Sequence, residues 1–504
     1  MNVEYQTVWK KGTFEAIRLS DVDQSVNKIL PLKWVFTYKF DKHRHLQKFK
    51  ARICVRGDLQ LPNGLDTYAS TLAGRSFRSL MAIVARFNLD TIQLDAVNAF
   101  TNARLDELIY VWFPPGFNKS GFCLQLHKAL YGLRRSPLLW QKSLTRTLES
   151  MGLKRLQEDD CIFIGKNVVV FVFVDDIAVI HRQKHKSEAQ QIVDGLKDTY
   201  EMKELGELSI FLGVRIIRDR NQRKLWLCLD NYITKICDEF KIEKSKKGVE
   251  TPMASDNLMP NEGQATAEEI HLYQRKDGSL NYAAIMGRPD IARTCSRLAE
   301  FMTNPSLAHH KAADQCLQYL YSTRYLAIEF NCEGNGILYC ASDASFADDS
   351  ITRKSTQGYV MMLFGGPIAW KSSKQRRVVT SSTEAELVAL TQATKEYLAT
   401  IRLVEELQLK LDDDYIMWCD NQQTLRLLTA ERPQATSKLR HININNLWLR
   451  QELQKGVLKY NWVKTNAMVA DGTTKAMPGQ KHALFLAQLG MTNVEEQITS
   501  LARN

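Results

Sequence analysis

Residues 168–180 restrict the fold of this chain more than any other segment does. Seven apolar residues run from Val168 to Val174, two aspartates follow at Asp175 and Asp176, and four more apolar residues close the segment. The β-branched and aromatic content predicts two strands joined by a tight turn. Adjacent carboxylates against so much apolar surface are costly unless a cation compensates them, and dense oxygen ligands suit Mg²⁺. Asp is also a common turn residue, so the remaining sequence must decide between these interpretations.

The composition predicts an intracellular protein of several domains with a basic excess. The chain has 504 residues, of which 44% are hydrophobic and 24% charged, and its net charge is +11. Such an excess fits nucleic acid as a partner first and a membrane surface second. The 10 cysteines form no CxxC pair and no zinc-like cluster, which indicates reduced thiols. The N-terminus is polar, without a visible signal peptide, and the apolar run is too short to span a bilayer.

Two basic strands are predicted near the N-terminus. Residues 33–40 (KWVFTYKF) and 49–56 (FKARICVR) alternate basic and apolar side chains, as half-buried strands do. Even spacing would place Lys50, Arg52 and Arg56 on one strand face. A cationic face of this kind can bind phosphates, or it can be a solvated edge guarded by charges. The local sequence favours neither interpretation.

The next segments place one more acid in an apolar setting. Residues 76–88 predict an amphipathic helix, and residues 92–100 (IQLDAVNAF) predict a short strand that contains Asp95. A lone Asp at this place is also compatible with capping the following turn. Residues 129–140 (ALYGLRRSPLLW) then lead into a helix that is expected to end near Met151.

These motifs, in this order, resemble those of a known family. LDAVNAF, KALYGLRRSPLLW and FVDD, with KWVFTYKF and KARICVRG upstream and LGELSIFLGVRI downstream, resemble the polymerase of copia-type LTR retrotransposons. The resemblance implies a multidomain α+β and α/β fold, in which a right-hand polymerase precedes a connection region and a ribonuclease H-like domain. The implied domains are 1–255 for the reverse transcriptase, 256–333 for the thumb or connection, 334–480 for the ribonuclease H-like domain and 481–504 for a tail. Helices are expected at 280–292 and 308–321.

The resemblance implies RNA-directed DNA synthesis with two Mg²⁺ ions in the active site. Such ions activate the primer 3′-OH and neutralise the leaving pyrophosphate of a dNTP. By the resemblance, Asp95, Asp175 and Asp176 hold them. Each of these acids also sits at the end of an apolar strand, where uncompensated charge is costly, so the physical argument agrees.

The same resemblance implies a substrate site beside these acids. Phe100 is expected to pack under the incoming sugar and to exclude a 2′-OH, although a core Phe is the ordinary interpretation. Tyr131 and Gly132 match the stretch beside the nascent base pair, and Lys50 and Arg52 match the position that holds the triphosphate. The family usually has Tyr before the acidic pair, where this chain has Phe173. Loss of that hydroxyl is expected to spare metal binding and to affect primer positioning or fidelity.

A second set of acids is predicted to meet in the C-terminal third. Strands are expected at 337–342, 358–364, 367–371 and 415–419, with a long helix at 381–408. Asp343 and Asp420 follow predicted strands, and Asp471 lies in VADGTTK. Acids at two strand ends plus one on a helix form a candidate metal site.

This region resembles the ribonuclease H domain of the same elements, through SDASFADD, RKSTQGYV, SSTEAEL, CDNQ and AD..TK. The resemblance implies that Asp343, one glutamate of TEAE, Asp420 and Asp471 hold two Mg²⁺ ions. SSTE fits a capping box, which assigns Glu384 to the helix start and Glu386 to the metal. Gly472-Thr473 replaces bulkier apolar residues of the family pattern, and is expected to loosen that segment.

The sequence thus predicts an RNA-directed DNA polymerase with a ribonuclease H, since no expected acid is missing. The expected partners are an RNA template, a DNA primer, RNA–DNA hybrid and dNTPs, with other retrotransposon polyprotein products as further candidates. The expected location is a cytoplasmic retroelement particle, with no membrane role; a nuclear phase and the oligomeric state stay open. Two alternatives are a catalytically silent nucleic-acid-binding remnant and a basic RNA-packaging protein, whose binding would be salt-sensitive and metal-independent.

Overall fold

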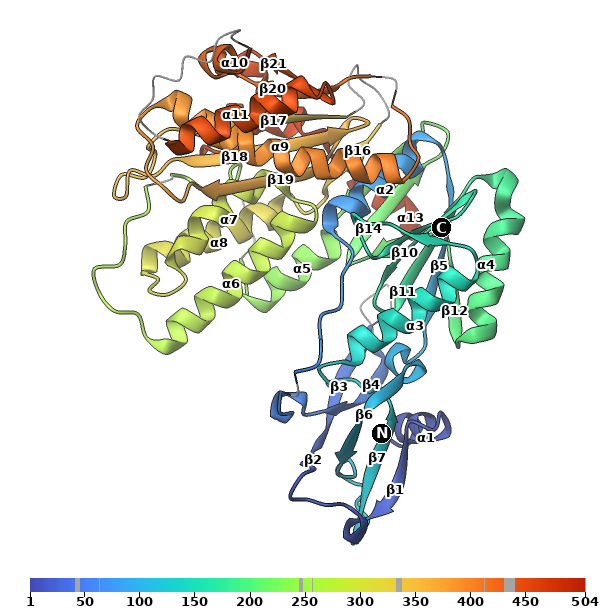
Figure 1. Ribbon diagram of the computed structural model, residues 1–504. Coiled ribbons are helices and arrows are strands. Elements are labelled where there is room, and N and C mark those ends of the chain that lie inside the picture. Colours follow the sequence, from blue (N-terminus) through green and yellow to red (C-terminus); the bar gives the residue numbers. More distant parts are fainter. Residues whose placement is uncertain are drawn as a thin grey trace. The chain divides into compact units, whose positions relative to one another are not determined.

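The computed structural model describes residues 1–40, 46–62, 64–243, 248–255, 257–331, 338–411, 413–429 and 440–503 (Figure 1). The chain divides into two compact units, and each is described by itself. The first comprises Met1–Leu72 and Asp90–Glu207, and the second comprises Ala73–Leu89 and Leu208–Asn504. Among the helices of the described ranges, none has the length and apolarity that a membrane crossing needs.

An antiparallel six-stranded sheet in the order β12-β5-β11-β10-β9-β8 forms the centre of the first unit. Its strands are β5 (Asp90–Ala96), β8 (Lys154–Arg155), β9 (Ile162–Ile164), β10 (Val168–Phe173), β11 (Asp176–His181) and β12 (Met202–Gly206). β10 pairs with β11 from Val168↔His181 to Phe173↔Asp176, which confirms the predicted tight hairpin. Apolar side chains from both strands are buried, so the hairpin forms the middle of the core.

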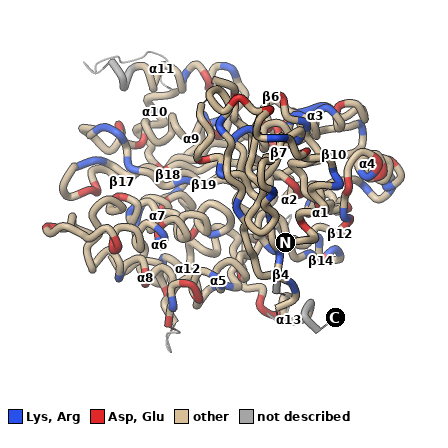
Figure 2. The backbone as a smooth tube through the Cα atoms, turned by 90° about the horizontal axis from the view of Figure 1, so that it is seen from below, with Lys and Arg blue, Asp and Glu red and all other residues tan. Residues whose placement is uncertain are grey.

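Two helices pack against this sheet, α3 (Ser136–Ser150) and α4 (Lys186–Thr199). α3 confirms the helix expected to end near Met151. Figure 2 shows basic and acidic residues along α4, whereas its buried side chains are Ala189, Val193 and Leu196. One face of α4 therefore covers the sheet and the other is solvated.

A four-stranded sheet and a separate two-stranded ribbon complete the first unit. The sheet has the order β1-β7-β6-β2, and α1 packs with it around a common apolar core. The bounds are α1 (Asn2–Lys10), β1 (Phe14–Arg18), β2 (Ile29–Leu30), β6 (Arg104–Val111) and β7 (Phe122–Lys128). The ribbon pairs β3 (Leu32–Phe40) with β4 (Leu46–Val55), which confirms both basic strands. Placing Arg56 on the strand face was wrong, because β4 ends at Val55 and Arg56 instead pairs with Asp58 at 2.7 Å.

The second unit contains a five-stranded sheet in the order β13-β14-β15-β16-β22 and a group of helices. The strands are β13 (Ile210–Phe211), β14 (Val214–Asp219), β15 (Lys224–Cys228), β16 (Leu326–Phe330) and β22 (Met491–Asn493). The helices are α2 (Gly74–Arg86), α5 (Asp230–Glu239), α6 (Ala267–Met286), α7 (Ala292–Leu298) and α8 (Leu307–Ser322). α2 and α8 confirm two predicted helices. A single helix over 280–292 was wrong, because Gly287 follows α6 and Pro289 starts a short 3₁₀ turn before α7.

A mixed sheet in the order β19-β18-β17-β20-β21 forms the other half of this unit. Its strands are β17 (Leu338–Ser345), β18 (Thr356–Leu363), β19 (Gly366–Lys374), β20 (Tyr415–Cys419) and β21 (Leu458–Trp462). The helices are α9 (Ser382–Glu406), α10 (Gln422–Thr429), α11 (Arg440–Gln454), α12 (Gly479–Gln488) and α13 (Glu495–Arg503). β18, β19, β20 and α9 confirm predicted elements. Asp343 lies inside β17 and not at its end, because the strand continues to Ser345.

The predicted domain boundaries stay predictions. Residues 256, 333, 334 and 337, on which two boundaries and the start of one predicted strand fall, lie outside the described residues. Residues 481–504, expected as a tail, contribute most of α12, all of β22 and α13. β22 pairs with β16 through Met491↔Ile328, so this end of the chain completes a sheet.

Candidate active sites

The first candidate site lies where β5 and the β10–β11 hairpin meet. Asp95 stands directly opposite Asp176 in the antiparallel register, and side chains so placed have Cβ atoms about 4.5–5.5 Å apart. Asp175 occupies the hairpin turn, and its carbonyl oxygen accepts a hydrogen bond from the Ala96 amide at 2.9 Å. The structure thus brings Asp95, Asp175 and Asp176 together, and all three are partly exposed.

Burial and neighbouring charges of both signs act on the acids of this site. Burial raises the pKa of Asp175 above its ordinary value, and the neighbouring Asp95 raises it further. Lys50 and Arg52 on β4 oppose that rise, so these two cations lie within electrostatic reach of the acids. A divalent cation would lower the repulsion among the three carboxylates more than these side chains do.

Aromatic side chains adjoin the acids. The Arg52 guanidinium lies 5.8 Å from the centre of the Tyr131 ring, and Phe100 meets that ring edge-on at 4.8 Å. Burial, with Asp175 next in importance, raises the pKa of Tyr131 to about 12. Phe100 lies in a 3₁₀ turn (Ala99–Asn102) and not in a strand, because β5 ends at Ala96. The predicted substrate residues Lys50, Arg52, Phe100 and Tyr131 therefore share one neighbourhood with the acids.

Gly132 has a close backbone contact that the sequence did not indicate. The Val55 amide donates to the Tyr131 carbonyl at 2.7 Å, which joins this segment to the end of β4. Gly132 has φ +92, and a Cβ there would lie 2.1 Å from the Val55 oxygen. The residue is thus required for the fold of the site.

Gly132→Ala is expected to lower the free energy of unfolding of the first unit by roughly 2–4 kcal/mol, through strain and a backbone clash. Gly152→Ala is the matched control, because Gly152 has φ +85 but nothing within 4 Å of an added Cβ. The control should lose only about 1 kcal/mol from strain. Urea denaturation followed by circular dichroism measures both losses, and equal losses would show that the contact with Val55 is unimportant.

The second candidate site joins three buried or partly buried acids of the second unit. Asp343, Glu386 and Asp420 each offer a carboxylate oxygen, and these atoms lie within 4.8 Å of one another. Over the part of the chain that the structure describes, no other three His, Cys, Asp or Glu side chains converge so closely. Asp343 belongs to β17, Asp420 follows β20, and Glu386 lies on α9. β17 and β20 are parallel neighbours, so their acids arrive at the same end of the sheet.

Burial and mutual repulsion dominate the electrostatics of this second site. Burial raises the pKa of Asp343 to about 6. Burial also raises the pKa of Glu386, to about 9, with Asp343 and Asp420 adding to the rise. Glu386 Oε1 accepts from the Ala344 amide at 3.2 Å, whereas its buried Oε2 accepts no hydrogen bond. A buried carboxylate oxygen without a hydrogen bond, on a side chain that belongs to an acidic cluster, fits a divalent metal ligand.

Glu384 has a different environment from Glu386, although both are buried. Its amide donates to Ser381 Oγ at 3.1 Å, as expected at the start of α9. Its carboxylate accepts from the Thr380 amide at 2.7 Å and from the Thr380 hydroxyl at 2.9 Å. Glu384 is therefore satisfied by hydrogen bonds at the helix start.

Asp471 lies at the edge of the second site, beside a lysine that sequence reasoning missed. The Lys475 ammonium pairs with Asp471 Oδ1 and lies 3.6 Å from Asp343 Oδ2. Asp471 is not one of the three acids that converge. The spacing of four residues between Asp471 and Lys475 was the available signal. Gly472 lies so close to Phe485 that an added Cβ would be 2.5 Å from the ring, so a bulkier residue would not fit here without a shift. The expected loosening of the segment stays a prediction.

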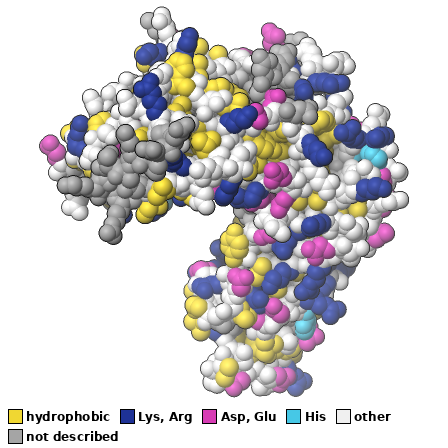
Figure 3. Space-filling model, turned by 45° about the horizontal axis from the view of Figure 1, so that its top comes forward, with side chains coloured by type: hydrophobic (Ala, Val, Ile, Leu, Met, Phe, Trp, Pro, Cys, Tyr) yellow, Lys and Arg dark blue, Asp and Glu magenta, His cyan; other side chains and the backbone are white. Residues whose placement is uncertain are grey.

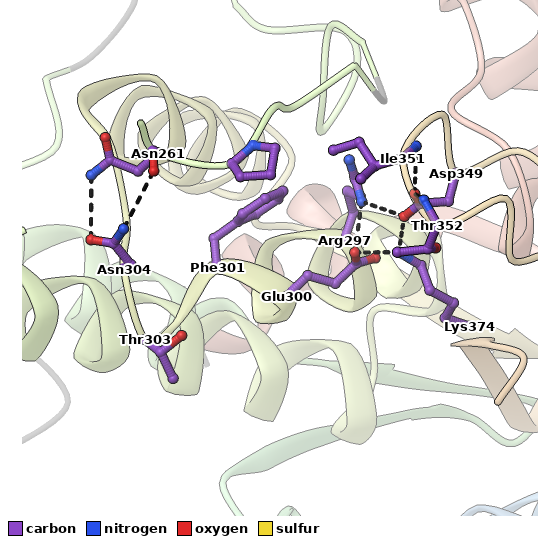
Figure 4. A pocket seen from close by; sticks show the side chains of 11 residues that line it. Asn261, Arg297, Glu300, Phe301, Thr303, Asn304, Asp349, Ile351, Thr352 and Lys374 are labelled. Atoms are coloured by element: carbon purple, nitrogen blue, oxygen red, sulfur yellow. Dashed lines mark hydrogen bonds and ion pairs between the residues drawn. The ribbon is translucent and has the colours of Figure 1, made fainter. Parts of the chain in front are cut away.

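A cavity of about 250 Å³ elsewhere in the second unit has charged walls but no free charge (Figure 4). Arg297 contacts Glu300 at 2.7 Å and Asp349 at 3.5 Å, and Lys374 pairs with the same two acids. Although burial opposes it, hydrogen bonding from Lys374 holds the pKa of Asp349 well below its usual range. This network of ion pairs joins α7, β19 and the loop around Asp349. We therefore assign these charged side chains a role in stabilising the fold and not in binding a ligand.

Comparisons with known proteins place this chain in a family. Residues 14–255 match the family described as reverse transcriptase (RNA-dependent DNA polymerase). The chain is 31% identical over 508 residues to the retrovirus-related Pol polyprotein from transposon TNT 1-94 of Nicotiana tabacum, covering 97% of this chain and 37% of that protein. It is 32% identical over 478 residues to the Pol polyprotein from transposon RE1 of Arabidopsis thaliana, covering 92% and 32%.

A shorter relative matches along its whole length. A transposon Ty5-1 protein of Saccharomyces cerevisiae is 31% identical over 315 residues, which are 60% of this chain and 100% of the relative. The chain therefore belongs to the reverse transcriptases of copia-type transposon Pol polyproteins. It spans about a third of the two plant polyproteins, at 37% and 32%.

A solved foamy viral protease-reverse transcriptase in complex with RNA/DNA hybrid is also similar, with a TM-score of 0.47 and 13% identity, covering 92% of this chain and 54% of that one. Of the predicted fold class, the described residues themselves show mixed α/β structure, with several sheets in two compact units.

Proposed function

We propose that this protein copies RNA into DNA and also cleaves the RNA strand of RNA–DNA hybrids, with two Mg²⁺ ions at each site. The observation that carries the proposal is the convergence of acids in two separate clusters. Asp95, Asp175 and Asp176 meet in the first unit, and Asp343, Glu386 and Asp420 meet in the second. Family membership supports the first activity, and the second rests on the geometry of its acids.

The residues present fit divalent ions at both sites, since hard oxygen ligands gather there and Glu386 Oε2 has no hydrogen-bond donor. Asp95, Asp175 and Asp176 would hold the ions of the first site. Asp343, Glu386, Asp420 and Asp471 would hold those of the second. When bound, the ions would activate the attacking oxygen and stabilise the leaving group.

The chain's own cations would orient the substrate at the first site. Lys50 and Arg52 lie close enough to Asp175 to lower its pKa, so a triphosphate held by them would lie next to the acids. The stacked arrangement of Arg52 on Tyr131, with Phe100 against Tyr131, would form the wall beside the incoming nucleotide. These contacts support the substrate roles predicted for the four residues.

The charge and the exposed aromatic rings of the β3–β4 ribbon support the proposal that this protein binds nucleic acid. Its strands contain five Lys or Arg residues and no Asp or Glu. Phe36 and Phe49 on the ribbon are 63% and 71% exposed, and exposed aromatic rings among cations suit stacked bases and phosphates. An RNA template, a DNA primer, their hybrid and dNTPs are the partners we propose, within an intracellular, cytoplasmic particle.

Phe100→Ala is expected to admit rNTPs, because it removes the ring that would meet a 2′-OH. The ratio of kcat/KM for dNTP over rNTP should fall by roughly tenfold or more. Trp112→Ala is the matched control, since it deletes an exposed ring of the same unit that has no proposed substrate role, and should leave sugar selectivity unchanged. Single-nucleotide incorporation on a primed template measures both, and unchanged selectivity in Phe100→Ala would remove the proposed gate role.

Extension of a DNA primer on an RNA template by the purified chain tests the proposed polymerase directly. Synthesis in Mg²⁺ and none in EDTA is the expected result. A silent nucleic-acid-binding remnant would bind the template without extending the primer. A packaging protein would bind in a salt-sensitive way whether or not metal is present.

On the face shown in Figure 3, basic side chains are interspersed with acidic and hydrophobic ones, which favours specific sites over one broad cationic surface.

A further inference from the structure

The turn that carries Asp175 has a strained backbone. β10 and β11 are joined by Val174 and Asp175 alone, because Phe173 already pairs with Asp176. Val174 has φ 56, a left-handed conformation that is a genuine outlier for a β-branched residue. Such a conformation persists only when surrounding contacts hold it.

One side of this turn has little packing to hold it. Val172 and Val174 line a cavity of about 550 Å³, together with Trp140, Leu144 and Phe163. A cavity removes the dispersion contacts that would otherwise resist movement of the turn. The hydrogen bonds of the turn therefore matter more than they would in a filled core.

Trp140 on α3 supplies such a hydrogen bond. Its indole Nε1 donates to the Val174 carbonyl oxygen at 2.6 Å, and the residue is only 2% exposed. The ring is itself fixed edge-on against Tyr200 at 5.1 Å. The Tyr200 hydroxyl is hydrogen-bonded to Ser143 at 3.0 Å and to Thr147 at 2.7 Å, both on α3. The donor thus belongs to a rigid group of side chains.

We propose that Trp140 is a positioning residue for DNA synthesis: its indole N–H holds the strained turn in the conformation that presents the Asp175 carboxylate beside Asp95 and Asp176. The Ala96 amide holds the next carbonyl, that of Asp175, from the opposite strand. The two donors fix successive peptide groups from two different elements. The inference rests on the proposed polymerase function and adds a residue outside the acidic cluster to it.

Trp140→Phe tests the inference, because it keeps an aromatic ring and removes the donor. The kcat of dNTP incorporation should fall by about tenfold through misplacement of Asp175. The KM for dNTP should stay within about twofold, since the triphosphate cations on β4 are untouched. Trp226→Phe is the matched control: Trp226 is 5% exposed and its Nε1 donates to Glu329 at 2.7 Å in the other unit. The control should leave kcat unchanged.

A second variant relieves the backbone strain at Val174. It should rescue kcat if Trp140 acts by holding the turn, and should not do so if Trp140 has only a structural role. Glycine adopts positive φ without a steric cost, so Val174→Gly in the Trp140→Phe background should restore much of the lost kcat. Hydrogen exchange provides a readout that needs no activity. The amides of residues 172–178 should exchange about tenfold faster in Trp140→Phe, and at the wild-type rate in Trp226→Phe.

Equal exchange at the hairpin in Trp140→Phe and the wild type would overturn the inference, as would a loss of kcat that Val174→Gly fails to restore in a folded protein. A wild-type chain that cannot extend a primer would instead overturn the proposed polymerase function. The exchange rates would then still decide whether Trp140 holds the turn.

Discussion

Asp175→Asn is expected to abolish DNA synthesis by this protein. The change keeps the size of the side chain and removes the charge that would bind metal at the hairpin turn. Burial and Asp95 already raise the pKa of Asp175, so the site is built for a group whose charge needs a cation. Loss of one metal-binding carboxylate should lower the rate of incorporation by about 10³-fold. Primer extension on an RNA template, followed over time in Mg²⁺, measures the loss.

Two controls sharpen this prediction. Asp58→Asn removes an exposed acid of the same unit, whose carboxylate pairs with Arg56, and should leave synthesis unchanged. RNA cleavage by Asp175→Asn should stay within about twofold of the wild type, because the acids of the second cluster are untouched. Loss of both activities in a folded variant would contradict two separate metal sites.

Glu386→Gln is expected to have the opposite effect, with loss of RNA cleavage and normal DNA synthesis. Glu386 brings its carboxylate to Asp343 and Asp420, so its replacement by an amide should lower cleavage by about 10³-fold. Glu384→Gln is the matched control on the same helix, two residues earlier, and the two side chains are 4% and 6% exposed. A labelled RNA annealed to DNA reports cleavage. If only Glu384→Gln loses it, the roles of the two glutamates are reversed.

Glu386→Gln also has an expected effect on stability in EDTA. The folded pKa of Glu386 is raised to about 9 from an ordinary 4.5, so ionisation opposes folding. The metal-free protein should therefore lose stability as the pH rises from the ordinary value towards the folded one. Glu386→Gln removes this slope, and should melt at a higher temperature than the wild type at pH 8 in EDTA. Added Mg²⁺ should raise the wild-type melting temperature more than that of the variant.

Local features of the fold could be predicted from the sequence alone. The apolar run with its acidic pair predicts the β10–β11 hairpin, because the segment is too apolar to lie anywhere but a core and the acids must turn outwards. The alternation in β3 and β4 likewise predicts their strands. The cap at Ser381 separates Glu384 from Glu386, since a carboxylate bonded to a helix start is already satisfied.

Errors arose where a short-range signal competed with contacts that follow later. Arg56 continues the even spacing of the basic face, yet β4 ends at Val55, where the Val55 amide bonds to the Tyr131 carbonyl. Phe100 was predicted in a strand because it continues an apolar pattern. Asn98 instead adopts φ 54, which ends the extended chain, and a 3₁₀ turn follows at Ala99–Asn102. Asp343 was predicted to lie at the end of a strand. β17 instead continues to Ser345, because it pairs with β18 as far as Thr356.

The amino-acid sequence by itself determined which residues are acids, which stretches become strands and helices, and through its motifs the family. These properties depend on residues that are neighbours along the chain, so the spacing of apolar and polar residues is enough to predict them. Only the tertiary structure decided that Asp343, Glu386 and Asp420 meet within 4.8 Å, that Asp471 is held by Lys475, and that Trp140 reaches the Val174 carbonyl. Those contacts join residues far apart in sequence through strand pairing and helix packing, which leave no local pattern to read.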